Sequence, residues 1–153
     1  MNTETKLIKF EEGITLESGN HLESFELIVE TYGQLNKSKS NGVLLCHAFS
    51  GNHHAAGKSG DGSIGWWDQL VGSDKAINTD KYFVVCCNNL GGCSGSSGPT
   101  SINPQTGKIY GKDFPQVSVL DWVNSQKMLS EKLGINKWHL VIGGSLGGMQ
   151  ALQ

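Results

Sequence analysis

The chain has 153 residues, with 12 basic residues against 14 acidic ones, a formal charge of −2 and 37% hydrophobic residues. This length and composition predict one soluble globular domain that is large enough to bury a core. The near-neutral charge argues against nucleic-acid binding, which would need a basic face. No apolar run approaches the roughly 18 residues of a membrane span, and residues 1–13 lack the apolar segment of a signal peptide. The expected location is therefore the cytoplasm, with no membrane partner.

Three counts stand out. Glycine is abundant, at 21 residues, against a usual share of about 7%. All 12 basic residues are lysines, so the chain has no bidentate guanidinium group with which to clamp a carboxylate. The four cysteines form no C-x-x-C pair. A disulfide framework and a zinc site are therefore not expected, and no metal is predicted.

The first half of the chain predicts strands separated by long loops. Residues 5–33 predict two or three strands that form an antiparallel hairpin at the edge of a sheet. The continuous apolar runs at 43–46 and 82–87 are typical of strands buried on both faces. Between them, a glycine-rich loop leads to residues 66–70, for which we expect a short helix.

The second half predicts two helices around a third buried strand. Residues 115–133 indicate an amphipathic helix with Pro115 in its first turn and Gly134 at its end. Its apolar face consists of Val119, Trp122, Val123, Leu129 and Leu133, with Gln126 as the single polar member. A buried strand at 138–142 and a new helix from residue 146 follow. Strands that alternate with helices and long loops predict an α/β fold with a largely parallel sheet.

The strongest chemical signal is G-x-S-x-G at Gly143–Gly147, between an apolar strand and a helix. A serine in a strained strand-to-helix turn needs small residues two positions before and after it. The motif therefore predicts Ser145 as a nucleophile at the carboxyl end of the sheet, with the backbone N–H of Leu146 as one oxyanion donor. The alternative is a plain glycine-rich turn with an idle serine.

The second oxyanion donor should come from the loop after an earlier strand, where the backbone N–H of Phe49 is the candidate. His47 in the same loop is expected to be hydrogen-bonded within the loop and not catalytic. In folds with this motif the triad runs serine, acid, histidine along the chain. All five histidines precede Ser145, so none of them fits the catalytic base.

Seven runs occur at residues 46–54, 65–68, 88–93, 101–104, 110–111, 113–115 and 143–150. They resemble the corresponding runs of the homoserine O-acyltransferases, the acyl-CoA-dependent enzymes of methionine biosynthesis. The resemblance covers nearly the whole chain, and the matching runs occur in the same order at similar spacing. Two departures are small: Phe49 stands where the family usually has leucine, and Ser97 where it commonly has threonine.

The resemblance implies the N-terminal part of an α/β-hydrolase fold, with an antiparallel first hairpin followed by parallel strands up to the nucleophile. Residues 1–153 would then be a truncated core domain, and the acid, the histidine and the helical lid would follow Gln153. The apolar spacing of Leu146, Met149 and Leu152 continues without a helix stop signal, which supports this expectation. The fragment alone should show no transferase turnover.

The resemblance also implies a reaction. Ser145 would take the acyl group from an acyl-CoA, and the hydroxyl of L-homoserine would then accept it. No cofactor is expected besides the co-substrate, acetyl-CoA or succinyl-CoA, and the full-length protein would be a homodimer. Gly51, Asn52 and Gly92 are the candidate substrate-binding residues.

Several alternatives stay open. A succinyl donor would want a cation for its free carboxylate. The chain offers only lysines for this, with Lys58 in a plausible loop, so acetyl is the simpler expectation. Serine as acceptor, an esterase in which water takes the acyl group, and a non-catalytic binding fragment are the others. The P-loop-like run at 51–59 has five residues between its glycines where four are required, and no helix follows it. His53 and His54 lack the spacing of a metal pair.

Overall fold

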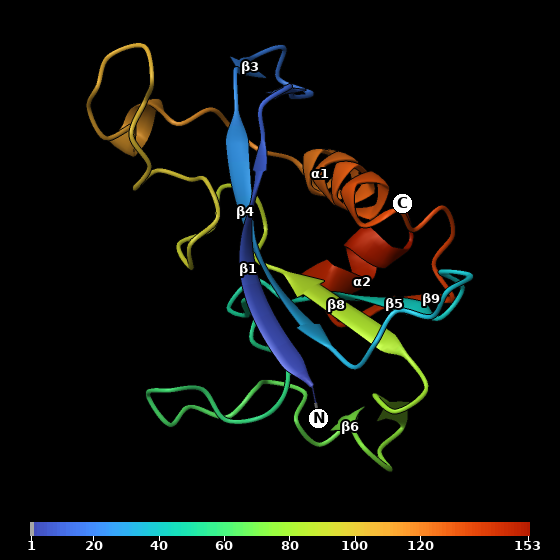
Figure 1. Cartoon of the computed structure of the whole chain (residues 1–153). Coiled ribbons are helices and arrows are strands. Elements are labelled where there is room, and N and C mark those ends of the chain that lie inside the picture. Colours follow the sequence, from blue (N-terminus) through green and yellow to red (C-terminus); the bar gives the residue numbers. More distant parts are fainter. Residues whose placement is uncertain (1) are drawn as a thin grey trace.

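The structure, a computed structural model, describes residues 2–153. Its elements follow the chain from a strand-rich first half to a second half with two α-helices (Figure 1). Their bounds are β1 (Thr3–Phe10), β2 (Ile14–Thr15), β3 (His21–Leu22), β4 (Phe25–Tyr32), β5 (Gly42–Cys46), β6 (Val71–Gly72), β7 (Ile77–Asn78), β8 (Phe83–Cys87), the 3₁₀ helix η1 (Gly111–Asp113), α1 (Val119–Leu133), β9 (Leu140–Gly143) and α2 (Leu146–Ala151).

The central sheet has the strand order β1–β4–β8–β5–β9. The strand β4 runs antiparallel to both β1 and β8, whereas β5 runs parallel to both β8 and β9. The expected antiparallel hairpin at one edge and the parallel strands after it are both confirmed. Because β5 and β9 are parallel neighbours, their carboxyl ends, which carry the loop with Phe49 and the turn with Ser145, lie at the same edge of the sheet.

Side chains of β5 alternate between two cores, one on each face of the sheet. Val43 and Leu45 pack with residues of the 55–77 segment on one face. Leu44 and Cys46 belong to the core on the other face, where Leu129 of α1 packs. Both helices lie on this second face (Figure 1). The prediction that β5 is buried on both faces is confirmed, since all five of its residues are buried.

The helix α1 begins at Val119, four residues later than the expected start at Pro115. Ser118 caps it in a capping box: its hydroxyl accepts a hydrogen bond from the Asp121 N–H, and the Asp121 carboxylate accepts one from the Ser118 N–H. Gly134, with φ of +69°, ends the helix as predicted. The same Asp121 carboxylate also accepts a hydrogen bond from the Glu17 N–H, so this cap ties the first hairpin region to α1.

The buried face of α1 is more polar than the sequence predicts. Leu129 is fully buried, and Trp122 and Leu133 pack against the same core, as expected. Ser125 and Ser130 are buried as well. Each donates its hydroxyl hydrogen to a carbonyl oxygen three residues earlier in the helix, which satisfies the hydroxyl without a partner outside the helix.

Two expectations are wrong. Residues 66–70 form turns and no helix; the single helical turn closed by the Val71 N–H on the Trp67 carbonyl leads at once into β6. The predicted strand at 138–142 starts only at Leu140. It is not buried on both faces, because β9 is the edge strand among residues 2–153 and Leu140 is exposed.

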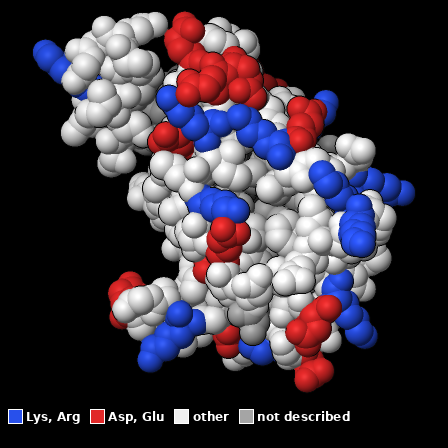
Figure 2. All heavy atoms as spheres, viewed as in Figure 1, with Lys and Arg blue, Asp and Glu red and all other residues white. Residues whose placement is uncertain are grey.

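Lysine and acidic side chains are interspersed over the face shown in Figure 2. Some of them pair at short range, such as Lys6 with Glu4 and Lys9 with Glu11. Among residues 2–153, none of the helices has the length and apolar character that crossing a membrane requires.

Candidate active site

Ser145 occupies the sharp turn between β9 and α2. Its backbone has φ of 55° and ψ of −123°, a region that residues with a side chain rarely adopt. Holding a non-glycine residue there costs about 1–3 kcal/mol, and such strain clusters at functional sites. The serine is exposed and its side chain makes no capping hydrogen bond to α2. The geometry is that of the strained elbow which the G-x-S-x-G spacing predicts.

The glycines two residues before and after Ser145 are required by the end of β5. A Cβ atom on Gly143 would lie 2.5 Å from the carbonyl oxygen of Cys46, and a Cβ on Gly147 would come closer still to the same oxygen. Since Cys46 is the last residue of a central strand, its carbonyl cannot move aside without disturbing the sheet. The steric argument from the sequence is confirmed at both positions.

Beside this turn lies a cavity of about 410 Å³ that Phe49 and Leu146 both line. The Phe49 side chain is 88% exposed. Neither the Phe49 N–H nor the Leu146 N–H donates a hydrogen bond to another group of residues 2–153. The two expected oxyanion donors therefore belong to residues that line one cavity, and their backbone N–H groups have no partner within residues 2–153. Their catalytic role stays a prediction.

His47 fixes the loop after β5, which carries Phe49. It is 3% exposed, its Nε2 accepts a hydrogen bond from the Asn89 N–H at 3.1 Å, and its Nδ1 lies 2.7 Å from the Ala48 carbonyl oxygen. Because the Asn89 N–H can only donate, Nε2 must be unprotonated and Nδ1 carries the hydrogen. Burial lowers the pKa of His47, with the bond to Ala48 partly opposing this. His47 is thus a neutral residue that joins two loops.

This arrangement predicts a pH-dependent stability. Since the folded state lowers the pKa of His47 below its ordinary value of 6.5, the neutral histidine stabilises the fold fully above about pH 6.5, and this contribution is lost as the pH falls below it. His53, whose pKa is also lowered by burial, adds to the same trend. Urea unfolding at pH 7.5 and pH 5.5 should show a smaller difference for His47→Gln than for the unchanged protein. An identical difference in both proteins would contradict this assignment.

The structure separates the three candidate substrate-binding residues. Gly51 and Gly92 line the cavity with Phe49 and Leu146. Asn52 does not line it but borders a neighbouring hollow. Its side-chain oxygen accepts a hydrogen bond from the His54 N–H, and its carbonyl accepts one from the Trp66 indole. Asn52 therefore shapes the loop after β5, and a direct substrate contact remains a prediction.

The glycine-rich loop after β8 is tied to β4. The Ser96 hydroxyl donates to the Asn88 carbonyl and accepts from the Ile28 N–H. Ser97 pairs with Glu26 through both its backbone N–H and its hydroxyl. These bonds favour a fixed wall of the cavity over a flexible connection.

A buried polar pair between the two helices could not be placed from the sequence. Gln126 of α1 donates to the side-chain oxygen of Gln150 in α2 at 2.6 Å, and Gln150 reaches the His47 carbonyl at 3.5 Å. The one signal was Gln126 itself, the polar member of an otherwise apolar helix face. The pair joins the helix that follows Ser145 to the loop that carries Phe49.

Two of the other histidines, His54 and His139, have partners other than Ser145. The Nδ1 of His54 lies 2.9 Å from the carboxylate of Glu30, which is buried on β4. The ring centre of His139 lies 4.9 Å from the ring centre of Tyr82 at a tilt of 34°. His139 precedes β9 and so lies at the opposite end of the sheet from Ser145. In the described range, 2–153, histidine, cysteine and acidic side chains form no group of three or more that could hold a metal ion. The P-loop-like run continues into a bridge between Lys58 and Ile64 and not into a helix.

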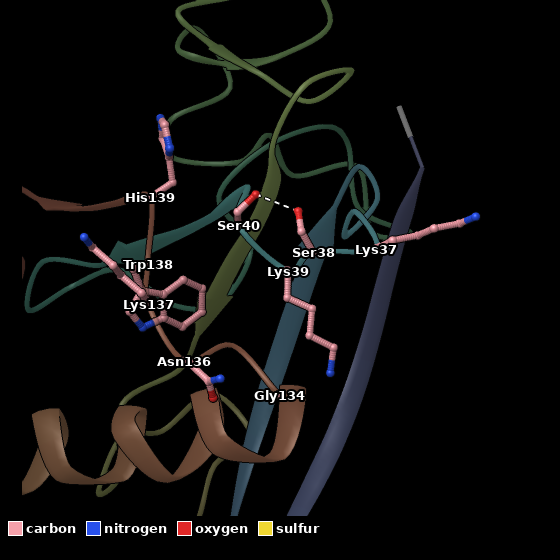
Figure 3. Close-up of a pocket in the computed structure, with 9 residues that line it drawn as sticks. All are labelled: Lys37, Ser38, Lys39, Ser40, Gly134, Asn136, Lys137, Trp138 and His139. Atoms are coloured by element: carbon pink, nitrogen blue, oxygen red, sulfur yellow. Dashed lines mark hydrogen bonds between the residues drawn. The ribbon is translucent and has the colours of Figure 1, made fainter.

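A second hollow, of about 510 Å³, lies at the opposite end of the sheet between residues 37–40 and 134–139 (Figure 3). Three lysines line it, but the side chains of Lys37, Lys39 and Lys137 point in different directions (Figure 3). They therefore do not converge on one point as an anion site would require.

Comparison with known proteins shows a family match and several similar proteins. Residues 41–153 match the family model described as the alpha/beta hydrolase fold. A homoserine O-succinyltransferase from Neisseria gonorrhoeae is 60% identical over 148 residues, which cover 95% of this chain and 39% of the relative. The crystal structure of homoserine O-acetyltransferase from Bacillus anthracis is 39% identical, with a TM-score of 0.91, over 99% of this chain and 42% of that one. The crystal structure of esterase E22 is 43% identical, with a TM-score of 0.90, over 99% of this chain and 43% of that one.

The sheet order, the strained serine turn and the family match together define a member of the α/β-hydrolase family, and the chain belongs to it. Within that family it is similar to proteins named homoserine O-succinyltransferase and homoserine O-acetyltransferase. The chain spans about two fifths of the length of these relatives.

Proposed function

We propose that the full-length gene product is a homoserine O-acyltransferase that works through an acyl-enzyme on Ser145, in methionine biosynthesis in the cytoplasm. The observation that carries this proposal is Ser145 in its strained turn, next to a cavity lined by Phe49 and Leu146, whose backbone N–H groups have no partner within residues 2–153. The similarity to homoserine O-succinyltransferases at 60% identity supports the choice of acceptor. By the family resemblance we also propose a homodimer, which light scattering would test.

In the first step, the Ser145 hydroxyl oxygen attacks the thioester carbonyl carbon of the acyl-CoA. The N–H groups of Phe49 and Leu146 stabilise the oxyanion of the tetrahedral intermediate. When the carbon–sulfur bond breaks, coenzyme A leaves as the thiol and takes up the proton that the serine released. The homoserine side-chain hydroxyl then attacks the acyl-enzyme, gives up its proton, and releases the O-acyl ester and the free serine.

Proton transfer in both steps needs a base. His47 cannot supply it, because both of its ring nitrogens are engaged in hydrogen bonds within the protein. We propose that a histidine and a carboxylate outside residues 1–153 complete the triad in the full-length gene product. Residues 1–153 alone should then have no transferase turnover.

The similar proteins differ in the acyl group that their names specify. The Neisseria gonorrhoeae relative, at 60% identity, is named a succinyltransferase, whereas the Bacillus anthracis structure, at 39%, is named an acetyltransferase. The higher identity supports succinyl-CoA over the acetyl-CoA that is simpler on sequence grounds. A competition assay with both donors, with the products separated by mass, would decide between them.

Ester hydrolysis is the second candidate, because esterase E22 is 43% identical over 99% of this chain. The test is release of coenzyme A by the full-length gene product with homoserine, with serine and without an acceptor. We expect fast release only with homoserine, together with its O-acyl ester. Release at the same rate without an acceptor, or rapid cleavage of simple acetyl esters with no acyl transfer, would favour the esterase and overturn the proposal.

A further inference from the structure

Asn89 is hydrogen-bonded to the loop that carries Phe49, the candidate oxyanion donor. It follows β8, the neighbour of β5 in the sheet, and its backbone N–H donates to His47 Nε2 at 3.1 Å. The residue is 6% exposed and lines the cavity that Phe49 and Leu146 border. Its position is therefore set by the same histidine that supports the loop carrying Phe49.

The side-chain oxygen of Asn89 is buried and has no hydrogen-bond partner within residues 2–153. Of the buried side-chain nitrogen and oxygen atoms that share this condition, which belong to His53, His54, Thr79 and Asn89, only the Asn89 atom belongs to a residue lining this cavity. A buried acceptor without a donor costs about 1–3 kcal/mol. Such a group in a native site calls for an explanation, and a bound ligand is one.

Two polar side chains near Asn89 have partners within the protein. The Trp122 indole N–H donates to the Leu90 carbonyl, and the Ser96 hydroxyl bonds to the Asn88 carbonyl. Gly92 leaves no room for a side chain, since a Cβ there would lie 2.9 Å from the Asn88 amide nitrogen. The wall around Asn89 is thus held by these contacts, and the side-chain oxygen of Asn89 within it has no donor among residues 2–153.

We propose that Asn89 is a substrate-binding residue whose side-chain oxygen accepts a hydrogen bond from an N–H group of a substrate. Two sources have this chemistry in the proposed reaction: an amide of the pantetheine arm of the acyl-CoA, and the ammonium group of the amino-acid acceptor. The inference rests on the proposed function and names the group that the cavity wall would recognise.

The test is Asn89→Leu in the full-length gene product, because leucine has a similar volume and no polar atom. We expect the KM of one substrate to rise, by about tenfold for a neutral amide and up to about a hundredfold for an ammonium group. The substrate whose KM rises identifies the donor. The Tm should stay unchanged or rise, since an unpaired buried acceptor has been removed. A purely structural role would lower the Tm and leave both KM values unchanged, which would overturn the proposal.

Thr79→Val provides the matched control. Its hydroxyl is also buried without a partner, and the residue lies outside this cavity, so Thr79→Val should leave both KM values unchanged. If Asn89→Leu does not fold, Asn89→Asp keeps the acceptor oxygen: retained KM values support the proposal, and risen ones overturn it.

If the unchanged full-length gene product shows no acyl-transfer turnover, the proposed function is overturned, but the inference about Asn89 is not. Calorimetric titration of coenzyme A and of homoserine into wild type and Asn89→Leu then makes the same comparison: weaker binding of either one to the variant supports the inference, and equal binding overturns it.

Discussion

Ser145→Ala is expected to lower the kcat of acyl transfer by the full-length gene product by about 10⁴- to 10⁶-fold, the range seen when a triad nucleophile is removed. The loss would be chemical, because the alanine keeps the Cβ and the same backbone strain at φ of 55°. The Tm should therefore stay close to that of the unchanged protein. Coenzyme A release at saturating donor and homoserine measures the effect.

Ser18→Ala serves as the control for this substitution. Ser18 lies on an exposed turn, where its hydroxyl accepts a hydrogen bond from Asn20, and its removal should leave kcat unchanged. If Ser145→Ala retained a kcat within about tenfold of the unchanged protein, Ser145 would not be the nucleophile.

Gly147→Ala should be the most damaging glycine substitution at the site. The new methyl group would overlap the carbonyl oxygen of Cys46, the last residue of a strand buried on both faces. Because neither β5 nor the turn can move freely, we expect a loss of about 3 kcal/mol or more in the free energy of unfolding, above the usual range for overpacking. Urea unfolding of the full-length gene product, or the failure to recover folded protein, measures this effect.

Gly144→Ala is the matched control, one position from the serine in the same turn. A Cβ at Gly144 would meet no atom within 4 Å, so its effect on stability should stay within about 0.5 kcal/mol. Equal stability of the two variants would show that the close approach of β5 to the turn does not hold in solution.

The serine turn could be predicted from the sequence because its requirements are local. Gly143, Ser145 and Gly147 sit within five residues, and the apolar strand before them and the helix after them are visible in the same stretch. What the sequence could not show was the reason for both glycines, the carbonyl of Cys46, since that contact joins positions about a hundred residues apart.

The features that were missed depend on contacts between distant elements. The pairing of Gln126 with Gln150 arises only when α1 and α2 pack together. The unpaired oxygen of Asn89 is invisible until the neighbouring polar groups have found their partners. A short helix is expected at residues 66–70, yet the Trp66 indole and the Asp68 carboxylate bond to the loop at 52–57, and the segment remains a turn. Periodicity alone cannot report such tertiary bonds.

The most direct test of the central claim is mass spectrometry of the full-length gene product after brief exposure to acyl-CoA without homoserine. We expect a mass increase equal to one acyl group, located on the peptide that contains Ser145 and removed when homoserine is added. The size of the increase also identifies the donor, acetyl or succinyl. An acyl group on another residue, or steady turnover without any adduct on Ser145 under conditions that trap the intermediate, would contradict the account.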